Sequence, residues 1–214
     1  GAYNFYDGDH FGEVKWARYG SSMTNQRFYE NKGRKTDFNI FAKADVSLSD
    51  QLSLFGDLQY RYVNYDVEGI DEGPVVVGLE DQNNFFNPKL GVNYFMDNSN
   101  FYLSYAKGHK EPKRADYLAN NGVKPESLDD IELGWNYGSD RFRLKMNLYY
   151  MNYRDQLVLT GNLDDVGNPI ADNIVKSYRL GLEIEAVLKI LDNLTWQPNA
   201  ALSRNKNIDK FYDF

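Results

Sequence analysis

The side chains best suited to acid–base or metal chemistry in this chain include two histidines, His10 and His109, which are far apart in the sequence. Neither lies in an H-E-x-x-H motif, and the chain has no G-x-S-x-G elbow and no Walker-type phosphate loop. It also has no cysteine, which excludes thiolate metal sites, cysteine nucleophiles and disulfides. We therefore predict no catalytic residue, no metal site and no cofactor, and we do not expect an enzyme.

Acidic side chains are the other candidates for chemistry. Asp129/Asp130 and Asp164/Asp165 have the groups of a hydrolytic pair, but they stand at predicted loops or strand starts, where solvated carboxylates are common. The acidic loop predicted at 67–85 offers the hard oxygen ligands that Ca²⁺ prefers, without the spacing of an EF-hand. We favour a solvated acidic loop, and calcium binding there stays open.

The composition indicates strands with mixed faces. The chain has 214 residues, 17 Tyr and 13 Phe, yet its mean hydropathy is −0.63. Many rings must therefore stand beside polar neighbours, as in alternating strands. No run approaches the ~18 apolar residues of a spanning helix. The net charge of −7, with no basic block interleaved with aromatics, argues against nucleic acid as a partner.

Period-two alternation recurs along the chain and predicts an antiparallel meander. In the segment 52–62 even-numbered residues are apolar or Gly while most odd-numbered ones are polar, and the segment 36–48 repeats the pattern across a short polar link. We predict about nine strands, with tight turns at 49–51, 97–99, 138–140 and 191–193 and long loops at 21–35, 67–85, 110–127 and 155–174. The expected strands are roughly 10–20, 36–48, 52–66, 86–97, 100–109, 128–138, 141–154, 175–190 and 194–206.

Tight turns that alternate with long loops are typical of an outer-membrane barrel. In that interpretation the apolar stripe faces lipid, and charged residues within strands face a hydrated interior. Aromatic residues near strand ends would sit at the membrane interfaces; they are Tyr60, Tyr62, Trp135, Tyr137, Tyr150 and Trp196. A soluble β-sandwich or lipocalin-like barrel that binds carbohydrate or another ligand is the alternative, because its sheets alternate in the same way.

Three segments carry a family resemblance. Residues 86–94 read FNPKLGVNY, residues 100–112 read NFYLSYAKGHKEP, and residues 122–134 read GVKPESLDDIELG. In this order they resemble the barrel of TonB-dependent receptors, whose strands carry K-x-G-x-x-Y, Y-x-S-Y-A-x-G-F-R-x-P and L-K-P-E-x-x-x-x-x-E-x-G. The chain departs from the second pattern, with His109 and Lys110 where many members have Phe-Arg.

The resemblance implies an all-β fold, in which residues 1–214 are part of a 22-stranded transmembrane β-barrel in the bacterial outer membrane. It implies a plug domain and further C-terminal strands outside this stretch, and TonB as a partner through that plug. The implied function is active uptake of a scarce nutrient, a ferric siderophore or other iron chelate first, a vitamin or glycan second. We place candidate ligand contacts at the outer rim, at His109, Lys110, Arg114 and Tyr117. Outer-membrane lipid is the surrounding partner, and exposed strand edges favour self-association of a fragment.

Overall fold

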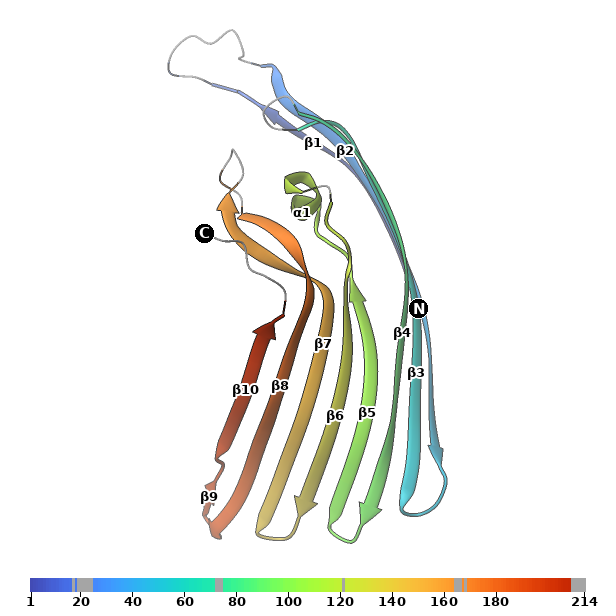
Figure 1. Cartoon of the computed structure of the whole chain (residues 1–214), viewed down its shortest axis with the longest axis vertical. Helices are drawn as coiled ribbons and strands as arrows, with labels where there is room; N and C mark the ends of the chain where they lie inside the picture. The colour runs from blue at the N-terminus through green and yellow to red at the C-terminus, as the bar shows by residue number, and fades with distance from the viewer. Residues whose placement is uncertain are drawn as a thin grey trace. The chain divides into compact units, whose positions relative to one another are not determined.

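A computed structural model describes residues 1–16, 18, 25–71, 75–120, 122–163, 167 and 169–208. These residues form one ten-stranded antiparallel sheet in the order β1-β2-β3-β4-β5-β6-β7-β8-β10, with β9 also paired to β8 (Figure 1). The strands and the one described helix are β1 (Ala2–Glu13), β2 (Arg27–Ser47), β3 (Leu52–Asp71), β4 (Val75–Met96), β5 (Ser99–Lys110), α1 (Arg114–Ala119), β6 (Glu126–Gly138), β7 (Phe142–Leu163), β8 (Pro169–Leu191), β9 (Leu194–Trp196) and β10 (Asn199–Asn207).

The predicted meander is confirmed, since each strand pairs with its neighbours in sequence. The four tight turns are also confirmed, and they lie at one end of the strands (Figure 1). In the turn between β4 and β5, Asp97 has a φ of 47°, in the left-handed region that Asp tolerates better than most residues. No second sheet exists among the described residues to cover either face, so the sandwich alternative has no support in the fold.

Several predicted boundaries are wrong. The first strand covers Ala2–Glu13 instead of 10–20, and most of the loops predicted at 21–35, 67–85 and 155–174 belongs to long β-hairpins. Only the loop predicted at 110–127 stays largely outside the sheet, and it contains α1. The ninth predicted strand is divided into β9 and β10 at Gln197 and Pro198, because proline has no N–H for the ladder.

The missed strand segments mix polar and apolar residues without clear period-two alternation, which explains the error. Polar residues give no period-two signal, but their backbone N–H and C=O groups pair as well as those of apolar residues. The register of β1 with β2, from Ala2↔Asn39 to Gly12↔Tyr29, continues through charged residues on both strands. Hydrophobic alternation therefore located the part of each strand in which apolar and polar residues alternate, and it missed the extension in which they do not.

The chain divides into two compact units, which are described separately: unit 1 is Gly1–Ile40 with Tyr60–Phe85, and unit 2 is Phe41–Gln59 with Phe86–Phe214. Unit 1 has a small core that includes Val63, Val67 and Phe85. Beside it, the Arg61 guanidinium donates from Nε to Asp37 Oδ1 at 3.1 Å and from Nη2 to Asp37 Oδ2 at 2.6 Å. This two-point bond joins β2 to β3 more strongly than a single surface ion pair would.

In unit 2, aromatic rings lie over glycines of the neighbouring strand. A Cβ added to Gly134 would overlap the Tyr102 ring, and one added to Gly181 would overlap the Tyr149 ring. The ring of Tyr102 is also held by its hydroxyl, which donates to Asn147 Oδ1 at 3.1 Å. These glycines leave room for rings on the same face as Glu132 and Glu183, and the rings cover backbone that glycine leaves bare.

Candidate functional site

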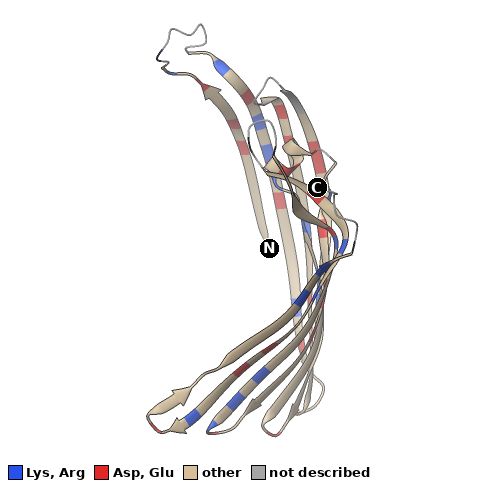
Figure 2. Cartoon of the chain, turned by 60° about the vertical axis from the view of Figure 1, so that its left-hand side comes forward, with Lys and Arg blue, Asp and Glu red and all other residues tan. Residues whose placement is uncertain are grey.

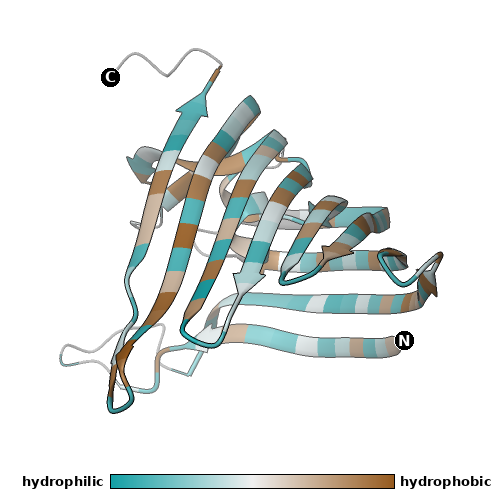
Figure 3. Ribbon diagram, turned by 90° about the horizontal axis from the view of Figure 1, so that it is seen from below, coloured by the Kyte–Doolittle hydropathy of each residue, from teal (hydrophilic) through white to brown (hydrophobic). Residues whose placement is uncertain are grey.

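The apolar face of unit 2 is a set of continuous rows across the sheet. Residues directly opposite each other on paired strands share a face, so the strand registers define each row. The central row is entirely aliphatic; its members are Val92, Leu103, Leu133, Leu148, Leu182 and Leu202. Figure 3 shows the same alternation as hydrophobic and hydrophilic bands along the strands. The row thus holds one valine and five leucines on six neighbouring strands, which a random surface would not show.

Aromatic rows lie on both sides of this aliphatic row. Toward the tight turns, Phe101 stacks on Trp135 with 6.0 Å between ring centroids, and Tyr137 lies 5.9 Å from Phe142. Toward the other end of the strands, Tyr150 lies 6.1 Å from Tyr178. We refer to the rows from Tyr150 to Phe142 as the apolar band, and Tyr178 lies in the row that borders it. Aromatic rings on both sides of an aliphatic zone are the pattern of a membrane-facing wall.

The six predicted interfacial aromatics occupy several positions. Trp135, Tyr137 and Tyr150 belong to the apolar band, and the register of unit 2 puts Trp196 opposite Leu188 beside the last tight turn, 57% exposed. Tyr60 and Tyr62 lie on the β3 segment of unit 1, where the Tyr60 hydroxyl donates to Asn84 Oδ1 at 2.7 Å. Their interfacial role stays a prediction.

The opposite face of unit 2 is polar and charged. Lys145 lies directly opposite Glu185 and Asn147 directly opposite Glu183, so basic and acidic groups alternate between neighbouring strands (Figure 2). These four residues help to line a hollow of about 240 Å³ with Tyr102. Charges at this density suit a hydrated surface and would not suit a dry core. The two faces therefore differ as the wall of a water-filled barrel requires.

The acidic candidates do not form a site among the described residues. Asp129 and Asp130 are consecutive in β6, so their side chains lie on opposite faces and cannot share a substrate. Asp164 and Asp165 lie outside the described residues. The acidic segment 67–85 is mostly paired strand, and the described part of the chain has no group of three or more His, Cys, Asp or Glu arranged to hold a metal. Within that part, no helix is long and apolar enough to cross a membrane.

The four candidate ligand residues lie at the end of β5 and in α1. His109 Nδ1 is 2.7 Å from Asn87 Oδ1, and the Lys110 ammonium donates to Glu126 Oε1 at 3.1 Å. Arg114 begins α1, and Tyr117 is buried to 6% exposure. Alternation places Lys110 on the polar face and His109 on the face of Leu103, beyond the apolar band.

The protonation of His109 depends on its surroundings. Burial lowers the pKa of its imidazole and the Lys107 ammonium lowers this pKa further, while the Asp129 carboxylate opposes them. These effects favour the neutral ring near pH 7, where one ring nitrogen accepts and the other donates. Whether the imidazole contacts a ligand stays a prediction.

Asn173 fastens the connection between β5 and β6 to the sheet, a role that was not predicted from the sequence. Its Oδ1 accepts from the Lys124 backbone N–H at 2.7 Å, and its Nδ2 donates to the Lys124 carbonyl at 2.9 Å and to the Asp155 carbonyl at 2.6 Å. The side chain thus pairs with Lys124 as a strand would. A second link is Asn120 Nδ2, which donates to Asp172 Oδ1 at 3.3 Å. The position of α1 therefore depends on β8.

We expect Asn173→Ala to loosen this connection, because three hydrogen bonds are lost, one of them partly buried, and each is worth about 0.5–1.5 kcal/mol. Amide hydrogen exchange in residues 114–124 should accelerate, while exchange in the paired part of β6 should not change. Asn205→Ala, an exposed position on β10, is the matched control. Equal exchange rates in both variants would show that Asn173 does not hold α1.

An antiparallel meander with tight turns at one end, one apolar face and one charged face defines a class: the wall of a β-barrel. The family model described as TonB dependent receptor-like, beta-barrel, matches residues 1–213. The chain therefore belongs to the TonB-dependent receptor family, as the three sequence segments indicated. No curated protein sequence matches it.

Solved structures share this fold. They include the FrpB iron transporter from Neisseria meningitidis, with 21% identity and a TM-score of 0.64 over 82% of this chain and 26% of that chain. The copper transporter OprC has 14% identity and a TM-score of 0.67, over 85% of this chain and 29% of that chain. The ferric-catecholate import receptor Fiu from K12 E. coli has 16% identity and a TM-score of 0.59, over 95% and 34%. The chain thus spans about a quarter to a third of their length.

Proposed function

We propose that this chain is part of the barrel wall of an outer-membrane receptor that takes up a scarce nutrient with energy supplied through TonB. A ferric siderophore or another iron chelate is the first candidate, and a vitamin or a glycan the second. Membership of the TonB-dependent receptor family supports transport as the function. The printed names of the similar structures, an iron transporter and a ferric-catecholate receptor, support iron as the first substrate to test. We propose no enzymatic activity.

The observation that carries the proposal is the apolar band. Between Leu180 and Leu188, strand β8 rises about 26 Å at ~3.3 Å per residue, which a tilt of about 40° reduces to about 20 Å of thickness. This is most of the height of the apolar zone of outer-membrane barrels, about 25 Å. A soluble protein rarely leaves an apolar face of this extent exposed. We infer that this apolar face contacts the lipid of the outer membrane.

We infer that the rest of the barrel, and the plug through which TonB acts, come from sequence outside residues 1–214. This chain covers only 26% and 34% of two of the matched structures, which supports this inference. β1 and β10 stand at the two ends of the strand order. Their outer edges would pair with further strands in a complete barrel, and would favour self-association of this chain alone.

The candidate ligand contacts remain His109, Lys110, Arg114 and Tyr117. Lys110 and Arg114 are the cations that an anionic ferric chelate would meet on entering from the α1 end of the wall. Tyr117 is buried, so we infer that it contributes by holding α1 in place. His109 would contribute through its imidazole, which is hydrogen-bonded to the Asn87 side chain.

Uptake of a radiolabelled ferric chelate by iron-starved cells that express the complete receptor tests the proposal. We expect accumulation that disappears when TonB is deleted. With Lys110→Gln and Arg114→Gln together, the half-saturating concentration should rise about tenfold, because charge-assisted contacts are lost. Lys189→Gln, which removes a cation beside a tight turn, should leave it unchanged. Uptake that persists without TonB would contradict the proposed mechanism, and uptake of only a vitamin or glycan would replace iron as the substrate.

A further inference from the structure

Basic side chains border the apolar band of unit 2 on the side away from the tight turns. The strand registers place Lys107, Asp129, Asn152, Tyr178 and Lys206 in one row, and His109, Ser127, Arg154 and Lys176 in the next. Arg204 joins them from the row of Tyr150 and Leu180. All are on the same face as Leu103. The described part of these rows holds five cations and one carboxylate, in a chain whose net charge is −7.

Two of these cations stand directly opposite each other. Arg154 on β7 pairs with Lys176 on β8, and both residues are exposed. Two cations in directly opposed positions create a positive potential that attracts anions. The polar face differs, because Lys145 is opposite Glu185 there.

Asp129 is the carboxylate that lies among these cations. It accepts from the Tyr105 hydroxyl at 2.7 Å, and it lies 3.5 Å from the Lys107 ammonium and 3.8 Å from the Arg154 guanidinium. One carboxylate shared among three donors fixes their directions and leaves a positive excess. Asp129 therefore orients the cations without neutralising the surface they form.

A hollow of about 420 Å³ lies in the apolar face on the band side of these cations. It is lined by residues of β3, β4, β5 and β6, among them Leu54, Leu90, Val92, Leu103, Tyr105 and Ile131. Tyr105 and Ile131 are the next same-face residues below Lys107 and Asp129, about 7 Å along each strand. An apolar hollow next to a basic rim matches a molecule with an apolar chain and an anionic head.

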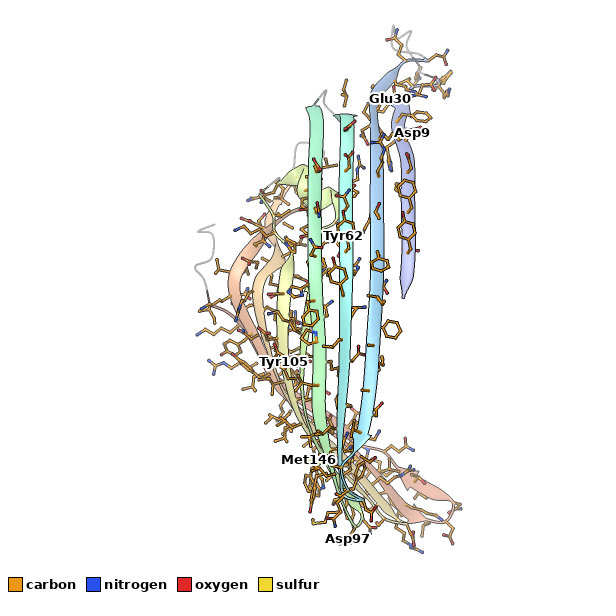
Figure 4. All side chains as sticks on the ribbon, turned by 90° about the vertical axis from the view of Figure 1, so that its right-hand side faces the viewer. Asp9, Glu30, Tyr62, Asp97, Tyr105 and Met146 are labelled. Carbon is orange, nitrogen blue, oxygen red and sulfur yellow. The ribbon has the colours of Figure 1, made fainter. Side chains whose placement is uncertain are left out.

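We propose that this face binds a phosphate-bearing lipid of the outer leaflet, with phosphate among Lys107, Arg154, Lys176, Arg204 and Lys206 and an acyl chain in the hollow. Lysine and arginine at a membrane surface attract anionic headgroups, and their long stems reach the interface from the edge of an apolar zone. Figure 4 shows Tyr105, on β5, well removed from the tight turn marked by Asp97. The binding site thus lies on the side of the long connections, which in such barrels is the cell exterior. The inference rests on the proposed outer-membrane location.

Binding can be measured on the purified complete receptor in a neutral sugar detergent, by titration with diphosphoryl lipid A followed by native mass spectrometry. We expect Arg154→Gln with Lys176→Gln to weaken binding about 30-fold, given the usual attraction of two basic residues to an anionic surface. Arg204→Gln with Lys206→Gln should weaken it to a similar degree. Arg143→Gln with Lys189→Gln removes two cations from the tight-turn end of β7 and β8, and should change binding less than threefold.

Two further arms identify the ligand. Removing the phosphates from lipid A should weaken its binding to the wild type. The remaining affinity should be no higher than the affinity of the Arg154→Gln, Lys176→Gln variant for diphosphoryl lipid A. Inorganic phosphate should not displace the lipid, because it has no acyl chain for the hollow. Displacement by phosphate, or equal losses in the control and the test variants at unchanged circular dichroism, would overturn the proposal. Either outcome leaves TonB-dependent uptake, measured in cells, untouched.

Discussion

Leu202→Arg is expected to destabilise the protein folded in a phospholipid bilayer by about 2–4 kcal/mol. This is the range for an arginine on the lipid face near the bilayer midplane. Leu202 belongs to the aliphatic row, between the aromatic rows of the apolar band. It is 71% exposed, so an arginine there would not clash with the protein. The loss therefore reports contact with lipid. Urea titration of the complete receptor folded into vesicles, followed by tryptophan fluorescence, measures it.

Ser203→Arg is the matched control, since Ser203 is the next residue on the same strand and faces the polar side with Gly181. We expect it to change the same free energy by less than 0.5 kcal/mol, as a surface substitution does. If both arginines are tolerated equally, Leu202 does not face lipid and the proposed location loses its main support. The neutral substitution Leu202→Ala should fall between them.

The apolar band was predictable because each of its residues obeys a local rule. A strand with one face in an apolar medium must alternate, so Leu144, Met146, Leu148 and Tyr150 mark their face without knowledge of any neighbour. The tight turns were predictable for a similar reason, since short polar links between alternating runs leave little freedom. The rows across strands were not predictable, because they depend on register, which appears only when two strands pair.

The polar parts of the structure show the limit of the same approach. The segments 27–35 and 75–85 form strand although neither alternates, and their pairing depends on backbone groups that every sequence possesses. Asn173 was missed because its partner Lys124 is far away in the sequence. The basic rows were missed because Arg154, Lys176 and Lys206 come from three strands. A search for same-face cations just beyond each apolar run would have found them.

The conformation of Gly69 was also hidden in the sequence, and it constrains unit 1. Gly69 has a φ of +134°, which is open to glycine and strained for other residues. A Cβ there would overlap the Glu30 carbonyl oxygen and the Asn31 Cα, which are backbone atoms of β2 and cannot rotate away. Asn31 is 2% exposed, and its Nδ2 donates to the Ile70 carbonyl at 3.4 Å. β2 and β3 thus pass each other at a distance that only glycine allows.

Gly69→Ala should therefore destabilise unit 1 by about 2–6 kcal/mol, from about 1–3 kcal/mol of backbone strain and a similar amount of overpacking. Amide exchange should accelerate in residues 28–40 and 60–71, and buried Val67 should become accessible to solvent. The control is Gly78→Ala on β4, where an added Cβ has open space. Exchange should stay slow in unit 2 for both variants, since its strand pairing does not involve Gly69. An equal response to the two alanines would mean that β2 can move away from β3, and that the close contact at Glu30 is not required for the fold of unit 1.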